Sequence, residues 1–154
     1  FWESNNCVSA ASAIQAILGP WIDQVERIVE IDHCIFCTEG VVRAFLKNDL
    51  AYAMRDGFPV TDGHCLIIPF RHVETYFELS EREILACNAL LLQTKQQLLS
   101  TDSSIGGFNI GVNSGEAAGQ TIFHCHIHLI PRRSGDVENP RGGVRHLIPG
   151  KGFY

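Results

Sequence analysis

The chain has 154 residues, the length of one ordinary domain, and 45% of them are hydrophobic while 19% are charged. Six cysteines are too few for a disulfide-rich secreted fold and suit a reducing cytosol. No apolar run approaches the roughly 20 residues of a membrane-spanning helix, and a net charge of −5 argues against general nucleic-acid binding. We therefore expect one cytoplasmic globular domain, residues 1–154, that binds neither membrane nor nucleic acid.

The chain begins with a stretch that predicts a helical N-terminal extension over residues 1–30. Residues 8–18 predict an apolar helix that ends at Gly19 and Pro20. Five later runs have the composition of strands. These runs are residues 41–46, 50–55, 64–69, 107–112 and 121–130.

The clearest helix is predicted over residues 80–100, between the third and fourth of these runs. Ser80 and Glu83 predict a capping box at its start. Apolar residues recur at helical spacing, which predicts one face turned to the core. They are Ile84, Cys87, Leu91 and Leu98. Because most strands follow one another directly, we expect an antiparallel sheet in an α+β domain.

The C-terminal residues differ from the rest in charge. Residues 131–154 carry five basic and two acidic groups, a net charge of +3, which leaves −8 for residues 1–130. Residues 135–154 are rich in glycine and proline and predict an irregular tail. The basic groups are Arg132, Arg133, Arg141, Arg145 and Lys151. Binding of an anionic ligand and exposure on a solvated surface explain these charges equally well.

Three histidines alternate in the apolar run FHCHIHLIPRR, residues 123–133. On a strand, His124, His126 and His128 share one face and span about 13 Å, too far for all three to bind one metal ion. Core packing accounts for one histidine but leaves the ring nitrogens of three needing buried partners. At least one of them therefore needs a role other than metal binding.

The loop directly before the histidines, NSGEAAGQT at residues 113–121, is rich in small residues. Such a backbone can approach an anion closely and direct its N–H groups at phosphate oxygens. Neutral imidazole is a competent nucleophile near neutral pH, and a second imidazole can protonate or hydrogen-bond the departing oxygen. Loop and histidines together indicate covalent catalysis on a phosphoryl group.

The combined motif GEAAGQTIFHCHIHLIPR resembles the signature of the histidine-triad family of nucleotide hydrolases and transferases. The resemblance continues upstream through CIFC and AFLKNDLAYAMRDGFPVTDGHCLIIPFRH and covers roughly residues 34–134. It is strongest with dinucleoside polyphosphate hydrolases of the fragile-histidine-triad type, because the transferase branch ends its motif in HxHxQ and this chain has His128 there. The resemblance implies a HIT-like fold with about five strands and a homodimer in which two sheets join.

The resemblance also implies roles for single residues. His126 would attack the α-phosphorus of a nucleotide to form a nucleotidyl-histidine intermediate that water releases, and His128 would contact the leaving oxygen. Asp56 would hold the ribose hydroxyls. The residues implied to lie near the phosphates are Asn113, Gly119, Gln120 and Thr121.

Cys34 and Cys37 form a CxxC pair whose thiolates can bind one zinc ion. A thioredoxin-like pair would begin a helix after a strand, which the preceding residues QVERIVEID do not clearly predict. By the resemblance, His72 and His124 complete a closed structural zinc site, and the reacting centre needs no metal. His33 and His64 are also near, and we expect each to be a surface or core residue.

Alternatives to this hydrolase remain open. A nucleoside phosphoramidase or a nucleotidyltransferase of the same family would act on the same α-phosphate with a different leaving group or acceptor. A zinc hydrolase would use histidines of the triad as catalytic ligands, although the chain has no HExxH or HxHxDH pattern. A non-catalytic nucleotide-binding module would have the same fold and would bind the nucleotide without catalysing a reaction.

Overall fold

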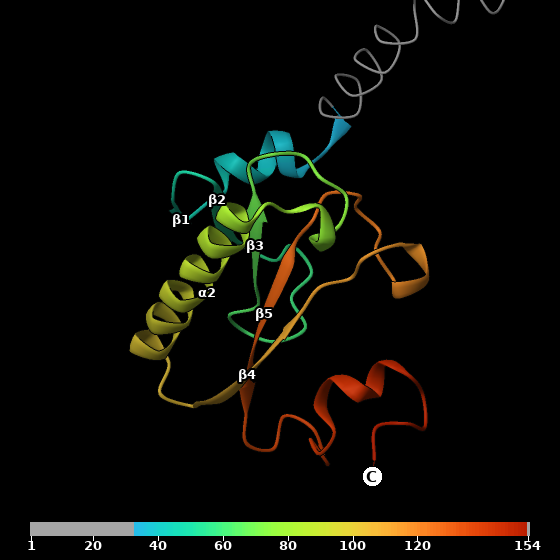
Figure 1. Ribbon diagram of the computed structural model, residues 1–154. Helices are drawn as coiled ribbons and strands as arrows, with labels where there is room; N and C mark the ends of the chain where they lie inside the picture. The colour runs from blue at the N-terminus through green and yellow to red at the C-terminus, as the bar shows by residue number, and fades with distance from the viewer. Residues whose placement is uncertain (1–32, 154) are drawn as a thin grey trace, which may run out of the picture.

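A computed structural model of the chain describes residues 33–153 (Figure 1). Within them, five strands form one antiparallel sheet in the order β1-β2-β3-β5-β4. The strands are β1 (Leu46–Lys47), β2 (Ala51–Arg55), β3 (Cys65–Pro69), β4 (Ile105–Gly111) and β5 (Ile127–Arg133). The expected α+β architecture with a five-stranded antiparallel sheet is confirmed. The helix expected over residues 8–18 lies outside the described residues.

One long helix, α2 (Glu81–Thr101), covers one face of the sheet (Figure 1). The predicted capping box is present, because the Ser80 hydroxyl accepts from the Glu83 N–H and the Glu83 carboxylate accepts from the Ser80 N–H at 2.8 Å. Side chains at three- and four-residue spacing are buried. They are Glu83, Cys87, Leu90, Thr94 and Leu98.

Successive side chains of a strand point to opposite sides of the sheet. Consecutive residues of the central strands are apolar, so both faces of the sheet are apolar. The face under α2 holds Ala51, Ala53, Ile67 and Ile127, packed with Cys87 and Leu90. The other face holds Tyr52, Met54, Leu66 and Ile68, packed with Cys34 and Phe36. Phe36 belongs to η1 (Phe36–Gly40), a short π-helical turn. The second face is the one that carries the candidate site.

Two strand predictions need correction. Residues 41–46 were expected to form a strand, but Val41 and Val42 extend the helical turn after η1 and only Leu46 belongs to β1. Val42 is 85% exposed, so its β-branched side chain has no sheet neighbour that would favour a strand.

The strand expected over residues 121–130 begins only at Ile127. The N–H of Cys125 donates to the carbonyl of Val73 at 2.7 Å, so the backbone here pairs with the loop after β3 and not with a sheet neighbour. His124 and His126 therefore precede β5, and His128 alone of the three lies on the strand. The expectation that all three share one face of one strand is wrong.

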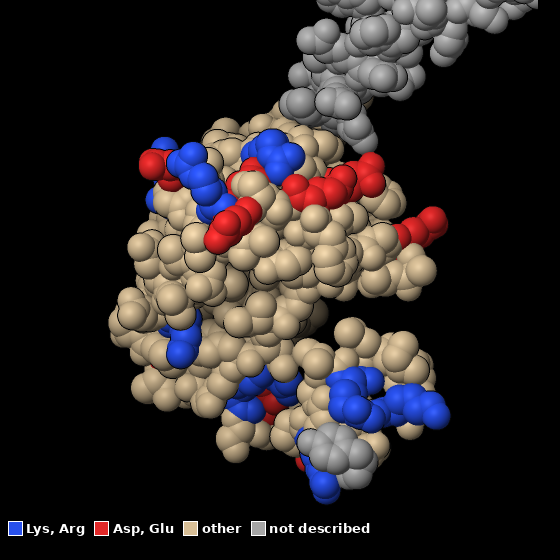
Figure 2. Space-filling model, in the orientation of Figure 1, with Lys and Arg blue, Asp and Glu red and all other residues tan. Residues whose placement is uncertain are grey.

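Three short 3-10 turns complete the described fold: η2 (Tyr76–Glu78), η3 (Glu116–Ala118) and η4 (Gly143–Leu147). The tail is irregular apart from η4, which lies against β4. Figure 2 shows basic side chains on the C-terminal segment, which a hollow separates from the body of the molecule, and most of the acidic side chains in this view lie beside basic ones on the far part of the body. None of the described helices combines the length and the apolar composition needed to cross a membrane.

Candidate active site and metal centre

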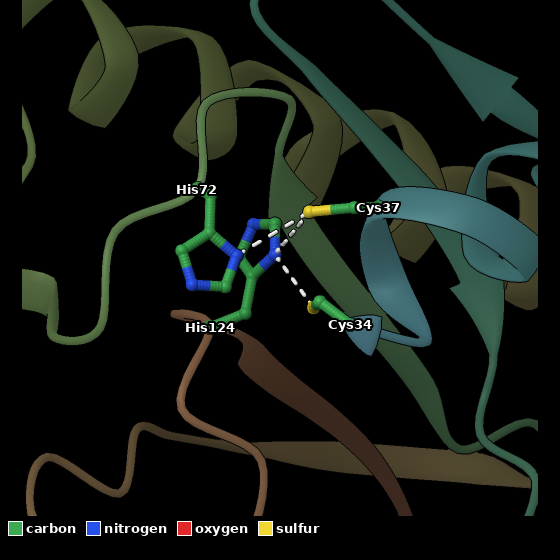
Figure 3. A group of neighbouring side chains, drawn as sticks. All are labelled: Cys34, Cys37, His72 and His124. Carbon is green, nitrogen blue, oxygen red and sulfur yellow. Dashed lines mark hydrogen bonds between the residues drawn. The ribbon is translucent and has the colours of Figure 1, made fainter. Parts of the chain in front are cut away.

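Four metal-ligand side chains converge from three separate segments (Figure 3). Cys34 and Cys37 come from the turn at η1, His72 from the loop after β3, and His124 from the segment before β5. One ligand atom from each lies within 4.8 Å of all the others. The four residues that the sequence pointed to are therefore brought together.

The spacing of these atoms fits a tetrahedral zinc ion. The Nδ1 of His124 lies 3.4 Å from the sulfurs of both Cys34 and Cys37, and the Nδ1 of His72 lies 3.3 Å from the Cys37 sulfur. Sulfur and nitrogen bound to one zinc at about 2.3 and 2.0 Å are roughly 3.6 Å apart at a tetrahedral angle. The sulfur–nitrogen distances in the structure are close to that value.

The hydrogen bonds and the burial of the cluster direct its ligand atoms toward a common point where a cation could bind. His124 is fully buried, and its Nε2–H donates to the carbonyl of Pro69 at 2.9 Å, so its Nδ1 lone pair faces the two sulfurs. Burial and the neighbouring Cys34 raise the pKa of the Cys37 thiol to about 12, and a bound cation would offset both effects. The donor set therefore fits zinc.

His126 follows two residues later and has a different environment. It is 7% exposed, and its ring lies edge-on to Phe36 with centroids 5.1 Å apart. Its Nδ1 is 2.7 Å from the backbone carbonyl of His124. A carbonyl can only accept, so Nδ1 carries the proton and Nε2 keeps its lone pair. This contact selects the tautomer of the neutral ring in which Nε2 is the acceptor.

His128, on β5, belongs to a chain of polar groups on the same face of the sheet. Its Nδ1 lies 3.0 Å from the Nε2 of His64, and the Asp56 carboxylate lies 3.4 Å from the Nδ1 of His64. Burial lowers the pKa of His64, and burial together with His126 and His64 lowers the pKa of His128 to about 4. Both rings are therefore neutral near pH 7.

The tautomers of this pair follow from the backbone. The N–H of Val60 points at the Nδ1 of His64 at 3.3 Å, so a neutral His64 carries its proton on Nε2 and donates to His128. His128 then carries its own proton on Nε2. That nitrogen is buried and has no hydrogen-bond partner. It is an unsatisfied donor next to His126, whose ring centroid is 5.1 Å away.

The loop before the histidines is shaped by Gln120. This residue is 3% exposed, and its amide donates to the carbonyls of Glu74 and Ile122 while its oxygen accepts from the Gly115 N–H. Gly119 has a φ of 85°, a left-handed conformation that favours glycine. Thr121 is exposed and Asn113 half-buried. The Gln120 side chain thus fixes the loop from inside.

His64 is the residue whose place sequence reasoning missed. It alternates with Leu66 and Ile68, which are buried on the site face, and this alternation was the available signal. The sequence does not reveal the register between β3 and β5. In the structure Leu66 pairs with His128, and this pairing places His64 beside His128. His33 is exposed and is not one of the four clustered ligands.

Comparisons with known proteins place this geometry in a family. Residues 39–135 match the HIT domain family. Adenylylsulfatase HINT3 of Arabidopsis thaliana is 36% identical over 118 residues, which cover 73% of this chain and 59% of that protein. AP-4-A phosphorylase of Mycobacterium tuberculosis is 33% identical over 103 residues, which cover 64% of this chain and 50% of that protein.

Among solved structures, a zinc-bound histidine triad family protein from Mycobacterium smegmatis is similar, with a TM-score of 0.64 and 27% identity. The match covers 71% of this chain and 81% of that one. The family match spans more than half of the chain, from η1 through β5, and includes the three histidines. The chain therefore belongs to the histidine triad, or HIT, domain family.

Proposed function

We propose that this chain is a nucleotide hydrolase that acts through a covalent nucleotidyl-histidine intermediate on His126. The observation that carries the proposal is the hydrogen bond from His126 Nδ1 to the His124 carbonyl at 2.7 Å. It holds the ring in the tautomer whose Nε2 lone pair can attack phosphorus. The same carbonyl would stabilise the positive charge that the ring acquires in the intermediate.

The reaction has two displacements at the α-phosphorus. In the first, the Nε2 of His126 forms a bond to phosphorus and the bond to the bridging oxygen breaks, so that the leaving group departs with the electron pair. In the second, water attacks phosphorus, the N–P bond breaks and the pair returns to Nε2, while the water proton passes to solvent. The His128 Nε2–H, which lacks a partner, would donate a hydrogen bond to the leaving oxygen.

Substrate binding is proposed for the residues around this centre. Asp56 stands at the end of β2 beside His64, where its carboxylate could accept from ribose hydroxyls. We propose phosphate contacts for Asn113, Gly119 and Thr121, which lie in or next to the loop before the histidines. The amide of Gln120 already makes three hydrogen bonds within the chain, so we propose that it supports phosphate binding by fixing the loop.

We further propose that Cys34, Cys37, His72 and His124 hold a structural zinc ion. When bound, zinc would stabilise the fold by joining three segments that are distant in sequence. It would take no part in either displacement. Elemental analysis of the purified protein, with one zinc per chain expected, tests this assignment.

The proposed substrate is a dinucleoside polyphosphate. The names of two relatives, an adenylylsulfatase and an AP-4-A phosphorylase, support an adenylyl-bearing substrate, and His128 in the third triad position supports hydrolysis. Nucleoside phosphoramidase and nucleotidyltransferase activities would share the first displacement on His126. They differ in the leaving group or in the group that accepts the nucleotidyl moiety.

The experiment is intact-protein mass spectrometry after rapid, acid-free quenching with a diadenosine polyphosphate. We expect an adenylate-sized adduct on the wild type and none on His126→Ala, because the alanine has no nitrogen to attack phosphorus. His146→Ala serves as the matched control, since His146 is exposed in the tail and should leave the adduct in place. Turnover by His126→Ala at the wild-type rate would contradict the covalent route.

A further inference from the structure

A second convergence of ligand-type side chains lies apart from the four-residue cluster. Asp56, His64 and His128 each contribute one atom, and these atoms all lie within 4.8 Å of one another. Two imidazoles and one carboxylate are a donor set that first-row transition metals bind with positions left open. We propose that these three residues form a second metal site for a zinc-like divalent ion, and that its occupancy inhibits the enzyme.

The distance between the two rings suits an ion. Two imidazole nitrogens bound to one metal at about 2.0–2.1 Å lie roughly 2.9–3.4 Å apart for ligand angles between 90° and 109°. The Nε2 of His64 and the Nδ1 of His128 are 3.0 Å apart. The ion would replace the hydrogen bond that now joins these two nitrogens.

The groups around the two rings favour replacement of this hydrogen bond by a metal ion. To free Nε2, the proton of His64 moves to Nδ1, where the Asp56 carboxylate 3.4 Å away can accept it, and the 3.3 Å contact from the Val60 N–H is given up. The same carboxylate is 3.8 Å from the Nδ1 of His128, so a shift of about half an ångström or more would bring an oxygen to the ion. The other oxygen of Asp56 accepts from the N–H of Phe58 at 2.8 Å, which orients the carboxylate. Its negative charge would offset part of the charge of the ion.

The inhibitory consequence rests on the proposed function. A metal ion at this site would fix His128 and occupy Asp56, the residues proposed to contact the leaving oxygen and the ribose. Substrate and metal would therefore compete. The binding itself does not depend on the reaction, so the two parts can be measured separately.

The test starts from protein that carries one zinc per chain and adds Co²⁺. We expect a second ion by equilibrium dialysis and elemental analysis, with a ligand-field absorption band and no thiolate charge-transfer band, because the site has no sulfur. Asp56→Asn should weaken binding of the second ion at least tenfold, and His128→Asn should abolish it. Asp62→Asn is the matched control: it removes the same charge from the same loop, and Asp62 is exposed.

Failure to bind a second ion would overturn the proposal, and so would wild-type affinity in Asp56→Asn. Hydrolysis of a diadenosine polyphosphate by wild type and Asp62→Asn should fall as Zn²⁺ is added and return when the excess is removed. Acceleration by Zn²⁺ would overturn the inhibitory role and support the zinc hydrolase alternative. If no variant hydrolyses the substrate, the proposed function fails, while the dialysis result still decides the metal site.

Discussion

The three histidines of the motif carry the same ring and differ in which nitrogen is engaged. His124 uses Nε2 on a carbonyl and turns Nδ1 to the cysteines, whereas His126 uses Nδ1 on a carbonyl and keeps Nε2. His128 receives a hydrogen bond at Nδ1 from another ring and holds an unpartnered proton at Nε2. The roles proposed for the three rings, a metal ligand, a nucleophile and a donor, thus differ through the choice of hydrogen-bond partner.

Glu83 shows at the same scale how one buried carboxylate couples stability to pH. Its oxygens accept from Arg71 at 2.9 and 2.7 Å and from the N–H and hydroxyl of Ser80. These contacts hold the pKa of Glu83 at about 2, below its ordinary value near 4.5. Its ionised form therefore stabilises the fold above pH 4.5, and this contribution is lost as the pH falls from about 4.5 to about 2.

We expect Glu83→Gln to lower the free energy of unfolding by about 1–3 kcal/mol at pH 7, because Arg71 loses its charged acceptor. The difference from wild type should shrink as the pH falls through 4.5, since protonated glutamic acid resembles glutamine. Urea unfolding between pH 3 and 7 measures both effects. Glu81→Gln, an exposed residue in the same helical turn, should follow the wild type at every pH. A constant difference across this pH range would contradict the coupling.

At the scale of elements, the loop between β2 and β3 carries Asp56 at its start and His64 at its end. Arg133 at the end of β5 holds this loop from the helix side: its guanidinium donates to the Thr61 hydroxyl at 2.9 Å and to the Asp62 carbonyl at 3.1 Å. It also bridges to Asp102 after α2. The carbonyl of Thr61 in turn accepts from the His64 N–H. We therefore expect Arg133 to be a positioning residue for the site.

Arg133→Met should remove these contacts while keeping an apolar side chain of similar length. We expect kcat/KM for a diadenosine polyphosphate to fall by roughly tenfold, and stability to fall by about 1–3 kcal/mol. Arg133→Lys should retain part of the kcat/KM and part of the stability that Arg133→Met loses. Arg82→Met, at an exposed position of α2, should change neither quantity, and equal losses in the two variants would remove Arg133 from the positioning role.

The predictable elements are those whose signals are local. Ser80 and Glu83 lie three residues apart, so their capping box could be read directly from the sequence, and the α2 helix follows. The segment around His124 looked like a strand because its composition is that of one, but its partner is Val73, which no local pattern identifies. The place of His64 depends on the register between β3 and β5. Contacts set by register are outside the reach of sequence reasoning. The CxxC spacing indicates half of the metal cluster, and only family resemblance indicates His72 and His124.

At the scale of the whole molecule, β4 leaves one edge of the sheet without a described partner strand. This edge is seven residues long, whereas β1 at the other edge has two. Beside β4 and α2 lies a groove of about 450 Å³ with apolar walls. Its lining includes Leu91, Leu92, Leu99, Phe108 and Ile110. A long edge strand beside an apolar groove favours pairing with another sheet, as the family resemblance implies for a homodimer.

We expect Ile110→Glu to convert a dimer into monomers, because Ile110 is 53% exposed on β4 and a charge there would be buried by pairing. Sedimentation velocity at several concentrations measures the mass. Val42→Glu is the control, since Val42 is 85% exposed on the turn after η1 and should leave the mass unchanged. A monomeric wild type at all concentrations would contradict the dimer.

The short spacing between His124 and His126 also limits how the chain can change in length. One residue, His124, carries both the ring that faces the cysteines and the carbonyl that bonds to His126, the proposed nucleophile. A single residue inserted at Cys125 would put a different carbonyl two residues before the His126 ring, so His124 would no longer serve both groups. An insertion in the exposed stretch 137–141 would leave both contacts unchanged. Among natural variants and engineered insertion libraries, the motif should therefore accept substitutions at Cys125 far more readily than any change in the number of residues there.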